Sequence, residues 1–173
     1  MQKITREVKQ DGLIYLLDDK KMTASIIDTE NLQQDDNIII PSSIFHESVK
    51  YTVISILEGS FTNTLIFSIQ FADFSKFRTI ENRAFENSSI ESISFPSSLV
   101  DLQDRWCIFT EYLNYIKIDS NNPRYSTYDD KFIIGKSSMK QEKYDVLVFC
   151  IRNVKTVTIP DFIEIIGPHA FDM

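Results

Sequence analysis

The sequence predicts a repeat solenoid that is mostly β-structure, in which short similar units stack along one axis. Apolar residues recur at one spacing, because Ile69 and Ile93 are 24 residues apart and so are Phe61 and Phe85. Around each recurrence, apolar and polar residues alternate over a short segment, which is the pattern of a half-buried strand. One such unit cannot bury its own apolar side, so we expect the units to stack into a continuous core.

Each unit is expected to begin with a strand and a turn. Ser92–Phe95 alternates polar and apolar residues, and Pro96 follows directly, where no N–H is needed for strand pairing. Pro41 and Pro160 hold the same position in other units. Two apolar anchors and an aromatic residue then complete the unit, so the strands of successive units are expected to form a parallel sheet on one face.

These units resemble the BspA-like leucine-rich repeat, whose pattern is roughly L-x-x-I-x-I-P-x-x-V-x-x-I-G-x-x-A-F. The stretch from Val157 to Phe171, V-T-I-P-D-F-I-E-I-I-G-P-H-A-F, matches it almost position for position. The segments 40–44 and 53–61 resemble the same unit carrying an insertion. The resemblance covers residues 11–173. It implies a leucine-rich-repeat solenoid, a right-handed superhelix with the parallel β-sheet on its concave face and little helix.

The expected organisation is an N-terminal lead-in, residues 1–10, followed by a single leucine-rich-repeat domain, residues 11–173. The domain is divided into a capping hairpin (11–28), repeats (38–118), an inserted β-hairpin (119–153) and a truncated last repeat (154–173). A solenoid end without a polar cap exposes its core. We therefore expect either that the chain is a fragment of a longer protein, or that a partner or a second copy in an end-to-end arrangement covers the last repeat.

The register is ambiguous in one repeat. Between Leu102 and Phe109 the chain has two residues too many, and Trp106 and Cys107 occupy the usual Ala-Phe position. Either Cys107 or Phe109 could therefore be the apolar anchor of this unit.

Composition excludes several kinds of partner. The net charge of −7 over 173 residues disfavours nucleic acid and anionic membrane surfaces, which both select clustered Lys and Arg.

No stretch approaches the roughly 18 apolar residues of a membrane-spanning helix. The first ten residues lack the apolar core of a signal peptide, so the sequence as written predicts a cytoplasmic start.

The sequence offers no set of residues with recognisable catalytic chemistry. Its two histidines, His46 and His169, have no zinc-type spacing to its two cysteines. Cys107 and Cys150 lie in apolar stretches and are expected to be buried free thiols, although a bridge between them is an alternative. Phosphate-binding glycine loops and nucleophile-elbow motifs are missing. We therefore predict no catalytic, metal or cofactor-binding residues, and a protein that is not an enzyme.

Binding is expected on the outward-facing side of the parallel sheet. The side chains that alternate with the core positions are Ser68, Gln70, Ser92, Ser94, Tyr115, Lys117, Thr156 and Thr158. This ladder is either a solubilising face or a surface that contacts a protein partner, centred on the aromatic Tyr115. Tyr125 and Tyr128 of the inserted hairpin are further contact candidates, because loops on a rigid scaffold often carry binding.

Two functions follow as hypotheses. The resemblance implies a protein-binding module of a cell-surface or secreted adhesion protein. The alternative is an intracellular scaffold or assembly component whose open end is covered by a partner, which the N-terminal sequence and the unpaired cysteines favour. The location stays open between these two.

Overall fold

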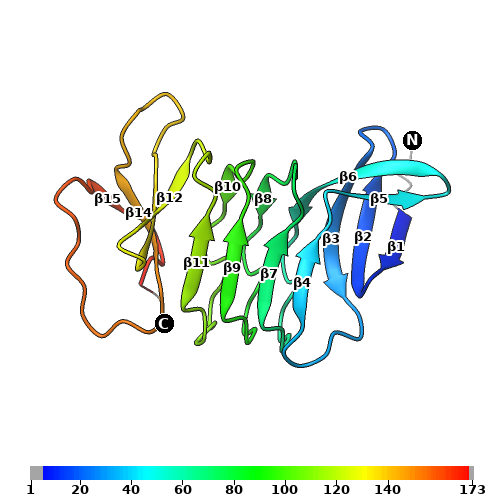
Figure 1. Cartoon of the computed structure of the whole chain (residues 1–173), viewed down its shortest axis with the longest axis horizontal. Helices are drawn as coiled ribbons and strands as arrows, with labels where there is room; N and C mark the ends of the chain where they lie inside the picture. Colours follow the sequence, from blue (N-terminus) through cyan, green and yellow to red (C-terminus); the bar gives the residue numbers. More distant parts are fainter. Residues whose placement is uncertain (1–5, 172–173) are drawn as a thin grey trace.

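The computed structural model describes residues 6–171, and all regular elements among them are β-strands (Figure 1). In chain order the strands are β1 (Arg6–Gln10), β2 (Leu13–Asp18), β3 (Thr23–Thr29), β4 (Asn37–Ile40), β5 (Ser43–His46), β6 (Val49–Ile56), β7 (Ser68–Phe71), β8 (Thr79–Ile80), β9 (Ser92–Phe95), β10 (Asp101–Leu102), β11 (Tyr115–Ile118), β12 (Tyr125–Tyr128), β13 (Phe132–Gly135), β14 (Val146–Cys150) and β15 (Ile165–Ile166). The prediction of a repeat fold with strands and little helix is confirmed.

The strands form three sheets. The first runs in the order β1-β2-β3-β6-β8-β10, with β5 paired to β6. The second, β11-β9-β7-β4, is parallel throughout, and Figure 1 shows its four arrows side by side and pointing the same way. The third runs β12-β13-β14-β15 near the C-terminal end.

The spacing of the repeats in the sequence corresponds to the distance along the chain from one parallel strand to its neighbour. Ile69 of β7 pairs with Ile93 of β9, and the next step pairs Ile93 with Ile116 of β11. These three side chains point into the core and are at most 9% exposed. Because the side-chain period of a strand is two, this register places every alternate polar residue on the opposite face.

Aromatic rings stacked from repeat to repeat form the centre of the core. The ring centroids of Phe61 and Phe85 are 5.0 Å apart, and Trp106 meets Phe85 edge-on at 6.0 Å. Trp106 also contacts Phe149 of β14 at 5.5 Å, so the stack continues into the third sheet. All four side chains are almost fully buried.

The structure resolves which residue anchors the irregular repeat. The amide of Phe85 donates to the carbonyl of Trp106, as the amide of Phe61 donates to that of Ala84. Trp106 and Cys107 therefore occupy the Ala-Phe position with the large and small side chains exchanged. Cys107 is 2% exposed, so it is the anchor, whereas Phe109 is 55% exposed.

Phe109 occupies a backbone position that elsewhere holds asparagine. It has φ +59°, and Asn63 and Asn87, two residues after the anchors of the preceding repeats, have φ +59° and +54°. Asparagine tolerates this left-handed conformation better than an aromatic residue does. The repeat backbone therefore keeps its shape here although the side chain is poorly suited to it.

A three-stranded antiparallel unit occurs twice. β1, β2 and β3 pair antiparallel and continue into parallel pairing with β6, and β12, β13 and β14 continue in the same way into β15. Both units carry a register shift in their second strand, after Ile14 and after Ile133. Each unit thus leads from antiparallel into parallel strand pairing.

The aromatic stack gives a direct stability test. Phe85→Ala should lower the free energy of unfolding by about 3–5 kcal/mol, because it removes a fully buried ring from the centre of the stack. Phe109→Ala, which truncates an exposed ring, should change it by less than about 0.5 kcal/mol. Urea unfolding followed by tryptophan fluorescence measures both, and equal losses in the two variants would contradict this description of the core.

Candidate functional site

The outer face of the parallel sheet is built from two rows of side chains. The register places Asn37, Ser68, Ser92 and Tyr115 in one row. The second row is Ile39, Gln70, Ser94 and Lys117. The opposite faces of the same strands bury Ile40, Ile69 and Ile93 completely. The core therefore fixes the spacing and direction of the outward side chains.

Four of the predicted contact residues lie around one groove. Gln70, Ser94, Tyr115 and Lys117 line a hollow of about 520 Å³ over β7, β9 and β11. The loop after β7, residues 72–75, and the turn after β9 form its other walls. We call this hollow the sheet groove. Ser92 lies half-buried in the same face, beside Tyr115.

Phe74 is a groove residue that sequence reasoning missed. Its side chain is 97% exposed, and its backbone has φ +57°, which is unusual for an aromatic residue. Together with Tyr115, 59% exposed, it provides a second aromatic ring in the sheet groove. The loop holding Phe74 lies between the β7 strand and the next repeat anchor, so its sequence, Asp73-Phe74-Ser75, carries no periodic pattern that would reveal it.

The first strand of the sheet also contributes a residue that the predicted ladder lacked. Ile39 of β4 points outward and is 64% exposed, next to Gln70. Its position could have been found from Ile40 and Pro41, which match the strand end of the repeat and set the alternation.

Ser68 was expected to face solvent but is only 4% exposed. Its hydroxyl donates to the side-chain oxygen of Asn37 on the neighbouring strand, so the buried hydroxyl has its hydrogen-bond partner within the sheet. Ser68 is therefore part of the sheet and not of an accessible contact surface.

Thr156 and Thr158 were expected to extend the ladder, and the structure does not place them there. Both side chains are exposed, but residues 151–160 form no strand, and the parallel sheet ends at β11. The third sheet follows β11 in the chain, and residues 156–159 pair with no described strand. Strand formation needs such a partner, since extended backbone alone leaves its N–H and C=O groups unpaired.

The two hairpin tyrosines differ in their surroundings. Tyr125 was expected to be a contact residue, but it is 4% exposed and its hydroxyl accepts the backbone N–H of Leu102 at 3.1 Å. It therefore ties the third sheet to β10. Tyr128 is 40% exposed and packs edge-on against Phe162 at 5.3 Å, which is also partly exposed.

A second groove runs along the edge of the sheet where its strands begin. It has a volume of about 230 Å³ and is lined by Gln34, Asp35, Leu65, Phe67, Ser89, Glu91 and Tyr112. We call it the rim groove. Sequence reasoning did not find it because its residues come from the turns before four different strands.

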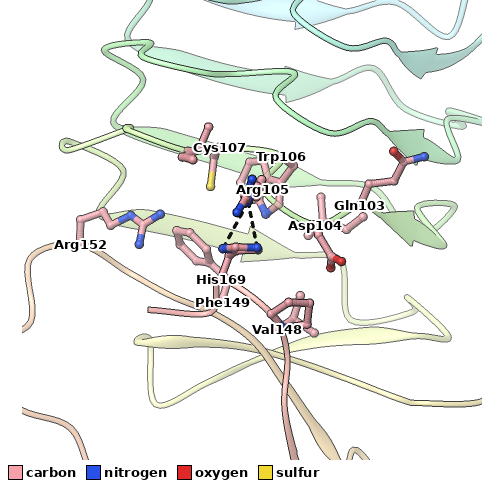
Figure 2. Close-up of a pocket in the computed structure, with 12 residues that line it drawn as sticks. Gln103, Asp104, Arg105, Trp106, Cys107, Val148, Phe149, Arg152 and His169 are labelled. Atoms are coloured by element: carbon pink, nitrogen blue, oxygen red, sulfur yellow. Dashed lines mark hydrogen bonds between the residues drawn. The ribbon is translucent and has the colours of Figure 1, made fainter. Parts of the chain in front are cut away.

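A small pocket lies where the Trp106 repeat meets β14 (Figure 2). Its volume is about 30 Å³, which leaves room for little more than water. Figure 2 shows Arg105 and His169 pointing toward one another, and Arg105 Nε donates to the imidazole Nε2 at 2.9 Å. This contact joins two repeats that are distant in the sequence.

Cys107 lies beside this pocket in surroundings that do not activate a thiol. Burial raises its pKa to about 12, although Arg152 nearby opposes the shift. Burial also raises the pKa of Cys150. A nucleophilic cysteine needs the thiolate near neutral pH, which both environments disfavour. Both cysteines are free and buried, so the alternative of a bridge between them is wrong.

Two further features of residues 6–171 bear on function. No three His, Cys, Asp or Glu side chains in this range are grouped so that they could hold a metal ion. No helix long and apolar enough to cross a membrane occurs in this part of the chain.

The chain belongs to the BspA-type leucine-rich repeat family. Residues 30–141 match the sequence pattern described as "BspA type Leucine rich repeat region" in six copies. None of the curated proteins compared with the chain has significant sequence similarity to it.

Three solved bacterial structures are similar to the chain. One is a leucine-rich repeat protein from Bacteroides capillosus, with 16% identity, a TM-score of 0.42 and coverage of 65% of both chains. A leucine rich cell surface protein from Faecalibacterium prausnitzii has 12% identity and a TM-score of 0.41, covering 91% of this chain and 65% of its own. The pneumococcal vaccine antigen PcpA has 15% identity and a TM-score of 0.40, covering 98% and 62%. The chain thus spans less than two thirds of each of these proteins.

Proposed function

We propose that this chain is a non-catalytic protein-binding module and that the sheet groove is its contact surface. The observation that carries the proposal is the pair of exposed aromatic side chains, Phe74 and Tyr115, over one hollow. Aromatic side chains are enriched among the residues that dominate binding energies. Folding alone does not account for an aromatic ring that is almost wholly in solvent, since it buries little apolar area there.

The polar walls of the sheet groove suit a protein partner. Gln70, Ser94 and Ser97 offer hydrogen-bonding groups in the same hollow as the two rings. Its lining also carries both charges, because Lys117, Asp73 and Asp119 contribute to it. Contact surfaces typically combine a few apolar anchors with such a polar surround. Within the proposal, the stacked repeats wind as a right-handed superhelix with this sheet on the concave side, which turns the groove toward a bound partner.

The setting in which the module acts is the second part of the proposal. Family membership favours adhesion or recognition at a cell surface, and the name of the Faecalibacterium relative, a cell surface protein, points the same way. A rigid sheet that presents a groove suits such a role, because little conformational freedom is lost when a partner binds.

The proposal is tested by binding to an immobilised extract of extracellular matrix, measured by biolayer interferometry. Phe74→Ala combined with Tyr115→Ala should weaken binding at least ten-fold, because truncating a central aromatic contact typically costs about 2 kcal/mol or more. Phe109→Ala, which removes an exposed ring outside the groove, should leave binding unchanged. Equal binding by the wild type and the double variant would refute the groove, and no binding by the wild type would refute adhesion.

A second candidate is an assembly component that associates through its last repeat. Ile166 pairs with Leu147 as Ile80 pairs with Ile56. The amide of Cys150 donates to the carbonyl of Ala170, as the amide of Phe61 donates to that of Ala84. Yet Ile166 is 54% and Phe171 40% exposed, whereas Ile80 is fully buried. An apolar face of this kind favours contact with a second copy or with another protein.

Sedimentation velocity over a range of concentrations tests this candidate. The wild type should associate reversibly, and Ile166→Glu should remain monomeric, because a carboxylate in an apolar contact is costly to desolvate. Ile39→Glu, an exposed isoleucine on the sheet face, is the matched control and should associate like the wild type. A monomeric wild type at all concentrations would exclude self-association through this face.

A further inference from the structure

The rim groove is formed by the turns that precede the strands of the parallel sheet. Asp35 lies just before β4, Phe67 before β7 and Glu91 before β9. Backbone hydrogen bonds fix these turns: the amide of Asp35 donates to the carbonyl of Leu65 at 2.9 Å, and that of Glu91 to the carbonyl of Phe67 at 2.9 Å. The groove is therefore a rigid feature of the repeat stack.

The walls of the rim groove carry apolar side chains that folding does not require. Leu65, Phe67 and Tyr112 are 53%, 39% and 55% exposed. The same turns also supply residues to the core, and Ile66 and Leu113 are fully buried there. Because the core positions are already filled, the three exposed side chains form a separate apolar surface around the groove.

The charge of the rim groove is entirely negative. Asp35 and Glu91 line it, and its lining contains no lysine, arginine or histidine. No ion pair within residues 6–171 involves either carboxylate. The chain as a whole carries a net charge of −7, which adds a long-range attraction for cations.

We propose that the rim groove is a recognition pocket for an arginine side chain of a protein partner. Arginine combines a planar, weakly hydrated cation, which stacks on aromatic rings, with donors that suit carboxylates. Its alkyl chain packs on Leu65, its guanidinium lies against Phe67 and Tyr112, and Asp35 and Glu91 supply the opposite charge. This inference rests on the proposed protein-binding function but uses a surface separate from the sheet groove.

The test is an NMR titration of the ¹⁵N-labelled full chain with N-acetyl-arginine amide. The amides of Leu65, Phe67, Glu91 and Tyr112 should shift with a common saturation curve. N-acetyl-citrulline amide has nearly the same shape without the charge and should bind more weakly. Binding of the arginine probe should also weaken as salt is added, since both carboxylates are near the surface.

Charge-removing variants sharpen the test. Asp35→Asn and Glu91→Gln should each weaken binding about two- to five-fold, as expected for loss of one solvent-accessible ion pair. Glu142→Gln, which removes an exposed carboxylate that lines neither groove, is the matched control and should have no effect. The inference is overturned by equal binding of the citrulline probe, by unchanged binding in both variants, or by shifts confined to other surfaces.

The titration separates this inference from the proposed function. A chain that takes up the arginine probe but binds no matrix protein refutes adhesion and leaves the pocket established. A chain that binds matrix through Phe74 and Tyr115 but ignores the probe refutes the pocket alone.

Discussion

The contact between one repeat and the next is the interaction on which the rest of the structure depends. A single unit presents apolar residues on one side and has nothing of its own to cover them. The rings of Phe61, Phe85 and Trp106 meet across three successive units and exclude water from all of them. The strand register, the turn geometry and the positions of the outward side chains all follow from this stacking.

Because the stack fixes the backbone, the exposed side chains on its loops and turns can vary without disturbing the core. The loop with Phe74 adds an exposed ring beside the sheet, and the turns before the strands add Leu65, Phe67 and Tyr112 at its edge. None of these side chains is needed to cover the core. The two grooves therefore differ in chemistry, one with mixed charge and one purely acidic, although the same repeats support both.

The periodic parts of the molecule could be predicted from the sequence, and the irregular parts could not. The recurrence of Ile69 and Ile93 specified the strand pairing, since it repeats both spacing and side-chain type. The exchange of large and small residues at Trp106 and Cys107 hid the anchor, because two candidates of similar hydrophobicity stood close together. The hydrogen bond from the Phe85 amide to the Trp106 carbonyl and the burial of Cys107 distinguish them.

The candidate site was predictable to a similar extent. Alternation along the strands predicts that Gln70, Ser94, Tyr115 and Lys117 share one face of the sheet, and the structure places these four around one groove. Their role in binding stays a prediction. It could not show that Tyr125 accepts a hydrogen bond from Leu102, nor that Thr156 lacks a pairing strand, because both depend on contacts between distant segments. The grooves themselves need side chains from several turns and are visible only in three dimensions.

Hydrogen–deuterium exchange of the backbone amides tests most directly whether stacking between repeats holds the structure together. Amides in β7 and β9, which pair with strands on both sides, should exchange slowest. Those of residues 155–159, which have no strand partner in the described chain, should exchange fastest. Slow exchange in β7 and β9, together with slow exchange of the Phe61 and Phe85 amides that donate to the next repeat, is the predicted result. Protection of the amides of residues 155–159 equal to that of β9 would contradict the view that stacking between repeats holds the structure together.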